Sequence, residues 1–209
     1  MNKHESKYFN TAFLFDESLI SLLMNKDIEY ITIKEICEKA HVNRSTFYLH
    51  YETIDDLLNE TIKYTVDKLV SHFDKDPHEF INNISLSNKD DLMLINDSYL
   101  RPFLIFIKDN KKIFIASFKR PKTMKSNEVY YDLEKYIINP ILDKYEIPDY
   151  KKKYYLNFYV QGIMGIIKEW VINDCNDDLD TIMNIIIECV KPWVLLRNIH
   201  IIVILLYLL

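Results

Sequence analysis

Residues 32–51 read TIKEICEKAHVNRSTFYLHY and place two short helical patterns on either side of a brief turn. The apolar positions of the first pattern recur at i, i+3, i+4 and i+7: Ile33, Ile36, Cys37 and Ala40. This spacing puts apolar side chains on one face of a helix. Thr32 and Glu35 have the spacing of a capping box, in which each side chain bonds the backbone amide of the other residue. The segment therefore predicts a short helix that begins at Thr32 and buries one face.

A second helix is predicted to begin after Asn43, a favoured N-cap residue. Val42 and Phe47 flank that cap at the spacing of a hydrophobic staple, which fixes the angle at which the chain enters the helix. The first turn would then present three polar side chains: Arg44, Ser45 and Thr46. Because this is where a recognition helix meets base edges and phosphates in a major groove, the segment predicts a helix-turn-helix. On spacing alone, a tight corner in an unrelated helical protein is the alternative.

The segment from Phe15 to Leu58 resembles the DNA-binding domain of the tetracycline-repressor (TetR) family of bacterial regulators. The matching residues lie in one fixed register: Ile31 and Thr32, Ile36 and Cys37, Ala40 and Val42, Ser45 to Tyr48, His50 and Tyr51, and Asp56 to Leu58. They correspond to the start of the second helix, the turn, the Ser/Thr-Phe-Tyr element and the acidic-Leu-Leu start of the fourth helix. The resemblance implies a dimeric regulator that binds double-stranded DNA.

Two positions depart from the family pattern. His41 stands in the turn where the family usually has Gly, so a residue with a Cβ must adopt a conformation that Gly adopts without strain. Ile54 stands at the start of the fourth helix, where the family usually has Lys. A phosphate contact that is usual in the family is therefore expected to be missing.

The resemblance also implies which residues contact DNA. Base edges are expected to meet three side chains: Arg44, Ser45 and Thr46. Phosphates are expected to bond four others: Thr32, Lys34, Tyr48 and His50. Asn43, between the two helices, completes the candidate set.

The chain is poor in residues that form hairpins. It has only two glycines, where average usage would give about fifteen. Its long segments follow helical periodicity instead. The predicted fold class is all-α, with a three-helix helix-turn-helix DNA-binding domain over residues 1–66. A larger helical domain for effector (ligand) binding and dimerisation is predicted over residues 67–209.

Charge is distributed unevenly along the chain. Residues 1–60 carry six Lys or Arg against eleven Asp or Glu, and the rest of the chain holds twenty of each sign. Release of counterions from phosphates supplies most non-specific affinity for DNA. The acidic first domain is therefore expected to bind non-specific DNA weakly, and the neutral remainder is not expected to bind nucleic acid. The basic stretch 119–125 is predicted to be a solvated loop.

No catalytic or metal-binding pattern is present in the sequence. Cys37, Cys175 and Cys189 lie far apart without CxxC spacing, and the six His form no HExxH pair. We therefore expect no enzyme activity, no metal and no cofactor, and we interpret the cysteines as small core residues of a reduced, cytoplasmic protein. Residues 1–10 are polar, so no signal peptide is expected.

The chain ends on an apolar tail, Ile199 to Leu209. Its eleven residues fall short of the roughly twenty that span a bilayer as a helix, so no membrane association is expected. We expect the tail to be buried against the body of the protein or the partner subunit, because it would promote aggregation if exposed.

Further helices are expected at about residues 91–109, 111–118, 128–145, 149–173 and 179–193. Residues 159–173, YVQGIMGIIKEWVIN, resemble the penultimate helix of one C-terminal subgroup of the TetR family. In that subgroup a Gly-Ile-Ile-Lys-x-Trp run lies near the dimer interface. The resemblance therefore implies an interface with these members: Gly165, Trp170, Ile186, Val190 and Trp193.

Gly162 and Gly165 both fall inside one expected helix, where each costs about 1 kcal/mol relative to Ala. Close approach of another helix or of a ligand would offset that cost. Family members usually have an effector cavity among aromatic residues of this domain, although plain core packing is the alternative for most of them. The candidate lining is Tyr99, Phe103, Phe106, Tyr136, Phe158 and Gly162.

The sequence therefore predicts a homodimeric repressor that leaves a palindromic operator when an unknown small-molecule or protein effector binds the larger domain. One alternative is a helical protein-interaction module with a vestigial helix-turn-helix, which the acidic first domain and Ile54 favour. A helical ligand-binding enzyme is a third. The effector, the operator, the target genes and the choice between repression and activation have no signature in the sequence.

Overall fold

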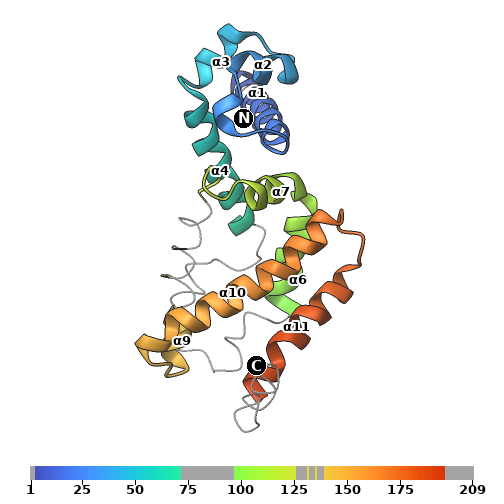
Figure 1. Cartoon of the computed structure of the whole chain (residues 1–209). Helices are drawn as coiled ribbons and strands as arrows, with labels where there is room; N and C mark the ends of the chain where they lie inside the picture. The colour runs from blue at the N-terminus through green and yellow to red at the C-terminus, as the bar shows by residue number, and fades with distance from the viewer. Residues whose placement is uncertain (1–2, 72–96, 126–130, 132–134, 136–138, 196–209) are drawn as a thin grey trace.

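The computed structural model describes residues 3–71, 97–125, 131, 135 and 139–195, and no strand occurs among them. Figure 1 shows two groups of helices, one at each end of an elongated molecule. The first group contains α1 (Lys3–Leu23), the 3₁₀ helix η1 (Ile28–Tyr30), α2 (Ile33–Ala40), α3 (Arg44–His50) and α4 (Ile54–Ser71). The second contains α6 (Asp97–Asp109), α7 (Lys111–Lys119), α9 (Asn139–Lys144), α10 (Asp149–Ile172) and α11 (Leu179–Leu195). The predicted all-α fold with an N-terminal helix-turn-helix is confirmed.

The first core lies where α1 meets the helix-turn-helix. Its largest fully buried side chains come from four helices: Phe15, Leu19, Leu23, Ile36, Phe47 and Leu57. Phe15 and Phe47 pack edge to face, with ring centroids 5.3 Å apart. Such a pair adds about 0.5–1.5 kcal/mol to the burial of the two rings, so it helps to hold α3 in a fixed position on α1.

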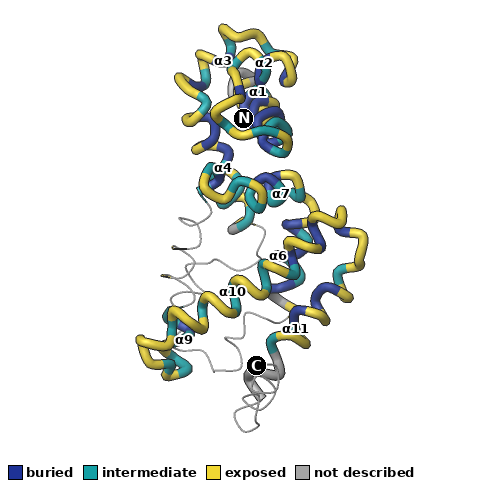
Figure 2. Tube along the Cα trace, in the orientation of Figure 1, coloured by how far each residue is buried: buried dark blue, intermediate teal, exposed yellow. Residues whose placement is uncertain are grey.

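The second core lies between α6, α10 and α11, and Figure 2 shows their buried sides in dark blue. Its fully buried aliphatic members are Leu104, Ile107, Ile167, Val171 and Ile186. Trp170 is also buried, and its indole N–H donates to the backbone oxygen of Asp177 at 2.9 Å. This bond fastens the turn after α10 to the core and so fixes where α11 begins.

Helix α7 belongs to both cores. Ile113 and Ala116 are buried in the first core, whereas Ile115 and Phe118 pack against the second. Phe114 contacts both. The effector-domain side of the chain is therefore continuous with the packing of the helix-turn-helix, and the boundary at residue 66 stays a prediction.

The basic stretch 119–125 is a turn, but its cations do not simply face water. Arg120 lies 2.7 Å from Asp27, with only 13 % of its side chain exposed. Lys119 donates to the backbone oxygen of Met24 at 3.2 Å, and Lys125 donates to Asn59 at 2.8 Å. The predicted loop is confirmed, with Lys119 and Lys122 exposed, but Arg120 and Lys125 also place positive charge on the acidic first domain.

The expected helices over residues 111–118, 149–173 and 179–193 are confirmed within two residues at each end. Of the expected helices 91–109 and 128–145, the described parts are α6 and α9. Cys37 and Cys175 are buried, but Cys189 is exposed, so its interpretation as a core residue is wrong. The tail Ile199 to Leu209 lies outside the described residues. Within the described ranges no helix is long and apolar enough to cross a membrane, and no cluster of potential metal ligands occurs.

Candidate nucleic-acid interface

The start of α2 is fixed by the predicted capping box. The backbone amide of Glu35 donates to the Thr32 hydroxyl at 3.2 Å, and the amide of Thr32 donates to the Glu35 carboxylate at 3.0 Å. Lys26 forms an ion pair with the same carboxylate at 2.5 Å. This hydrogen bond from Lys26, with those from Thr32, lowers the pKa of Glu35 to about 2. Glu35 is therefore ionised at neutral pH and joins the end of α1 to the first turn of α2.

The turn between α2 and α3 bends at His41. This residue has φ 55° and ψ 38°, the left-handed conformation expected where the family has Gly. Its amide bonds carbonyl oxygens of the last turn of α2, and the amide of Val42 bonds the Cys37 carbonyl at 3.0 Å. His41 thus ends α2 despite its Cβ, at the conformational cost anticipated from the sequence.

Asn43 stands at the N-cap of α3, as expected, but its side chain forms no capping hydrogen bond. The cap is made instead by its backbone oxygen, which accepts from the amides of Thr46 at 2.9 Å and Phe47 at 3.2 Å. Val42 and Phe47 pack in the same core, in agreement with the predicted staple. The Asn43 side chain is consequently exposed and free of a local role.

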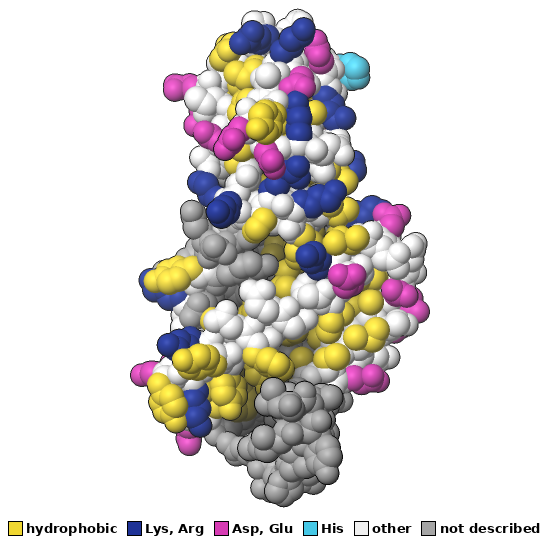
Figure 3. Space-filling view, viewed as in Figure 1, with side chains coloured by type: hydrophobic (Ala, Val, Ile, Leu, Met, Phe, Trp, Pro, Cys, Tyr) yellow, Lys and Arg dark blue, Asp and Glu magenta, His cyan; other side chains and the backbone are white. Residues whose placement is uncertain are grey.

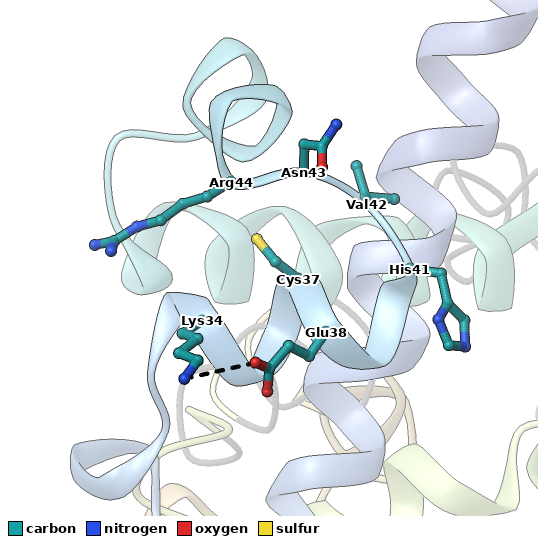
Figure 4. A pocket seen from close by; sticks show the side chains of 7 residues that line it. All are labelled: Lys34, Cys37, Glu38, His41, Val42, Asn43 and Arg44. Atoms are coloured by element: carbon teal, nitrogen blue, oxygen red, sulfur yellow. Dashed lines mark ion pairs between the residues drawn. The ribbon is translucent and has the colours of Figure 1, made fainter.

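Most of the candidate DNA-binding residues lie on the outer side of α2 and α3. Six of the candidates are exposed: Thr32, Lys34, Asn43, Arg44, Ser45 and Tyr48. Thr46 and His50 are half-buried. An open hollow of about 370 Å³ lies beside the turn. Figure 4 shows the side chains that line it, with Arg44 extending from α3 and Lys34 from α2. Lys34 lies 3.7 Å from Glu38, so one carboxylate partly offsets its charge.

Arg44 and Tyr48 form a pair that the sequence analysis missed. An Nη atom of Arg44 donates to the Tyr48 hydroxyl at 3.1 Å, and the guanidinium carbon lies 5.7 Å from the ring centroid. Their i, i+4 spacing on a helix was the available signal. The pair holds the guanidinium along the exposed side of α3.

His50 lies under an aromatic cover. Its ring stacks on Tyr8 of α1, with centroids 4.0 Å apart and planes at 18°. Burial lowers the pKa of His50, so the imidazole is neutral near pH 7. Any phosphate bond from His50 would therefore come from a neutral ring. Tyr8 was not among the predicted site residues, because nothing local in the sequence links residues 42 positions apart.

The start of α4 has an acidic cap where the family usually has Lys. The amide of Thr53 donates to Asp56 at 2.8 Å, and the amide of Asp56 donates to the Thr53 hydroxyl at 3.1 Å. Asp55 is exposed beside them, and Ile54 packs against the first core. Two carboxylates therefore occupy this helix start, which agrees with the expected loss of a phosphate contact.

Comparison with known proteins identifies the family. A family model described as bacterial regulatory proteins, tetR family, matches residues 20–61. A second, described as a transcriptional regulator C-terminal region of the TetR type, matches residues 97–192. The chain belongs to the TetR family of transcriptional regulators.

One curated relative is an uncharacterized HTH-type transcriptional regulator, YxbF, of Bacillus subtilis (strain 168). It is 30 % identical over 105 residues, which are 50 % of this chain but only 25 % of the relative. This chain therefore spans about a quarter of the length of that relative.

Two solved structures share the fold at 13 % identity. The dihydroxyacetone kinase operon activator DhaS has a TM-score of 0.51 over 88 % of this chain and 95 % of its own. A TetR-like transcriptional regulator from Rhodococcus sp. RHA1 has a TM-score of 0.58 over 84 % of this chain and 91 % of its own. They support a TetR-type arrangement of an N-terminal DNA-binding domain and a C-terminal helical domain.

The candidate effector-pocket residues of this TetR protein are not gathered around one described cavity. Phe106 is buried against Phe114, with ring centroids 6.1 Å apart, and Phe103 is half-buried beside the second core. Phe158 and Gly162 are exposed on α10. The side chain of Tyr99 and the whole of Tyr136 lie outside the described residues.

The close approach expected at the two glycines does not occur within the described part of one chain. A Cβ placed on Gly162 or on Gly165 meets no heavy atom within 4 Å, apart from neighbouring residues of the helix itself. Both residues are exposed on α10. The expected close approach of a helix is therefore wrong within the described protomer, while approach by a second copy or by a ligand stays a prediction.

The candidate dimer-interface residues differ in how far they are buried. Gly165 is exposed and Val190 half-buried, whereas Trp170 and Ile186 are buried in the second core; the side chain of Trp193 lies outside the described part. An unpredicted hollow of about 580 Å³ lies between α10 and α11, above Trp170. Its apolar lining includes Ile166, Ile172, Ile182 and Ile185. Helical periodicity could not distinguish these positions from ordinary core positions.

Proposed function

We propose that this protein is a homodimeric repressor that binds a near-palindromic operator in the cytoplasm and leaves it when an effector binds the α6–α11 region. The observation that carries the proposal is the geometry of α3. Arg44 and Ser45 are exposed in its first turn, while Phe47 anchors the same helix in the core. A rigid helix with an exposed polar start is what insertion into a major groove requires.

Two copies are part of the proposal for a physical reason. One recognition helix of seven residues buries too little groove surface for operator affinity. Two copies related by a two-fold axis can instead read the two halves of a palindrome. The exposed side of α10, with Gly165 and Ile172, supplies an apolar surface for the second copy.

Arg44 is proposed to read base edges. Its contact with Tyr48 restricts the guanidinium before DNA binds, so less side-chain freedom is lost on binding. Tyr48 would then keep its hydroxyl near the backbone of the same half-site. The acidic start of α4 implies few ionic contacts, so operator binding should depend weakly on salt for this fold.

Selection of bound sequences from random duplex DNA tests the proposal. The wild-type chain should enrich a motif with two repeated arms. Arg44→Ala should relax the preference at particular positions, at a cost of about 1–3 kcal/mol, whereas Tyr48→Phe should weaken binding to all sequences alike. Lys63→Ala, which removes an exposed cation from the middle of α4, is the charge-matched control and should keep the motif. No enrichment at low salt would favour the protein-interaction module instead.

A lysine at the start of α4 tests the borrowed docking geometry. Ile54→Lys would restore the family's residue but would also remove an apolar contact with the core. Asp55→Lys is the cleaner change, because Asp55 is exposed. It should tighten specific and non-specific binding together and steepen the salt dependence by about one unit per subunit for each phosphate that the new side chain neutralises. Unchanged affinity and slope would mean that α4 does not approach the DNA backbone.

Repression is tested in cells. A reporter placed behind the selected operator should be silenced by the wild-type chain and by Lys63→Ala, but not by Arg44→Ala. DhaS is described as an operon activator, so the same reporter must also be read for a rise in expression. A rise that Arg44→Ala abolishes would replace repression with activation and leave the DNA-binding part of the proposal intact.

A further inference from the structure

Helices α1 and α4 are joined by a buried pair of polar side chains. Asp16 on α1 is 8 % exposed, and Thr61 on α4 is 1 % exposed. The Thr61 hydroxyl oxygen lies 2.6 Å from a carboxyl oxygen of Asp16 and 2.8 Å from the backbone oxygen of Leu57. The Thr61 contact is the shortest hydrogen bond between Asp16 and a described side chain. The two residues lie 45 positions apart in the sequence.

These two contacts constrain where a proton lies. The Thr61 hydroxyl has one hydrogen, while both the Leu57 carbonyl and an ionised Asp16 can only accept. With Asp16 ionised, only one of the two short contacts can be a hydrogen bond. With Asp16 protonated, its O–H donates to the Thr61 oxygen and the Thr61 O–H donates to Leu57. Only the protonated acid makes both contacts favourable.

The groups around Asp16 also favour the neutral form. Glu17 on α1 and Glu60 on α4 both act on it as negative charges. Glu60 accepts a hydrogen bond from the Tyr51 hydroxyl at 3.2 Å, and Lys112 of α7 is 3.5 Å from Glu17.

Tyr51 interacts electrostatically with Asp16, and its ring centroid lies 5.8 Å from that of His50. His50 of α3 stacks on Tyr8 of α1, and burial lowers its pKa, so it brings no positive charge near pH 7. Burial, assisted by Glu60 and Glu17, raises the pKa of Asp16 to about 6, and only a bond donated by Thr61 to the ionised carboxylate opposes this rise.

We propose that Asp16 and Thr61 form a proton-operated latch between α1 and α4, which is closed when Asp16 carries its proton and loosened when Asp16 is ionised. Only three residues separate α3 from α4. The latch therefore affects how firmly the proposed recognition helix α3 is held in the first domain. Ionisation puts a third carboxylate beside Glu17 and Glu60 at a site that water barely reaches. The first domain is consequently more firmly closed in mildly acid solution than at neutral pH.

The sign of the effect on stability follows from linkage. The folded-state pKa, about 6, lies above the usual value of 3.8. The stabilisation from proton binding is therefore fully present below the usual value and is lost as pH rises through 6. Relative to a variant that cannot ionise, the wild-type unfolding constant should rise by up to about tenfold per pH unit between roughly pH 4 and 6.

Urea denaturation of the full chain at several pH values, for wild type and Asp16→Asn, tests the latch. Asn keeps the size of the protonated acid and cannot titrate, so the wild type should lose stability relative to Asp16→Asn as pH rises. Asp67→Asn, which removes an exposed carboxyl from α4, is the matched control and should follow the wild type. Parallel pH profiles for wild type and Asp16→Asn would overturn the proposal.

A second measurement needs no variant to fold. Carbon NMR of the wild-type chain can follow the Asp16 carboxyl through a pH titration. A midpoint near 6 supports the latch, and a midpoint near the usual 3.8 overturns it. Neither measurement involves DNA, so failure of the latch is distinguishable from failure of the proposed operator binding.

Discussion

The outer side of α2 and α3 and the outer side of α10 and α11 are both exposed helix surfaces, but they carry different chemistry. The first presents polar and cationic groups, among them Arg44, Ser45 and Lys34. The second presents large apolar groups, among them Phe158 and Ile172, with charged side chains exposed between them, and Figure 3 shows hydrophobic side chains gathered over this end. A polar surface is stable in water and can also bind a hydrated ligand, whereas a contiguous apolar surface is stabilised most when a protein partner removes it from water.

The two surfaces also differ in what holds them. The α3 surface rests on Phe47 and Phe15, which are completely buried, and its turn is fixed by backbone bonds within a few residues. A Cβ added at Gly162 or Gly165 on the α10 surface meets no heavy atom within 4 Å. The first surface is therefore complete in one chain, while the second is exposed where we propose that a second copy binds.

The largest expected effect tests the support of the α3 surface. Phe47→Ala should lower the free energy of unfolding by about 3–5 kcal/mol, because it leaves a cavity against Phe15. Leu49→Ala, on the same helix with Leu49 79 % exposed, is the control and should stay within about 0.5 kcal/mol of wild type. Urea denaturation followed by fluorescence measures both. A nearly neutral Phe47→Ala would mean that α3 is held from outside this core.

The sequence predicted the α2–α3 region well because its determinants are local. The capping box of Thr32 and Glu35 spans three residues, and the left-handed turn follows from His41 in a glycine position. Contacts between distant residues were missed: the stacking of Tyr8 on His50, and the pairing of Arg120 with Asp27 across 93 positions. No periodic pattern specifies which distant partner a side chain will find.

The α10 region was predicted as a helix but not as a surface. Apolar residues at helical spacing occur both where Trp170 is buried and where Phe158 is exposed. Periodicity gives the helix, yet it does not say which apolar side meets the same chain and which is left for a partner. For this reason the sequence did not reveal that Phe158 and Gly162 are exposed on α10, and the effector pocket expected around them stays a prediction.

A smaller effect is expected for the side chains that cap helix starts in the two groups of helices. Thr32 caps α2, and Asp178 accepts the amide of Thr181 at 2.8 Å before α11. Thr32→Ala and Asp178→Ala should each cost about 1 kcal/mol at neutral pH. Unequal costs would show that one helix start is held by tertiary packing instead. Glu188→Ala, at an exposed site on α11, should cost less than about 0.5 kcal/mol.

The pH dependence of the two caps has a definite sign. Hydrogen bonds from Lys26 and Thr32 lower the pKa of Glu35 to about 2, and bonds from Thr181 lower the pKa of Asp178. Their stabilisation is present above the usual values of 4.5 and 3.8 and is lost as pH falls through the folded-state pKa. The cost of Asp178→Ala should therefore shrink as pH falls below the usual value of 3.8, as thermal melts at several pH values would record. If the cost of Asp178→Ala stays constant down to pH 2, ionisation of the Asp178 carboxylate is not what stabilises the start of α11.

The smallest expected effect decides whether the α10 surface is half an interface. Within one chain a methyl group on Gly165 meets nothing, so Gly165→Ala should stabilise a monomer by up to about 1 kcal/mol through helix propensity. If a second copy packs closely on this surface, Gly165→Leu should instead lower the dimer fraction in sedimentation, and Gly165→Ala should stabilise less than the helix propensity predicts. Lys168→Leu, at an exposed position on the next turn of α10, is the control for added apolar bulk. If Gly165→Leu leaves the wild-type oligomeric state unchanged, the dimer contact lies elsewhere. The proposed difference between the α3 surface, which is complete in one chain, and the α10 surface, which a second copy covers, would then be wrong at Gly165.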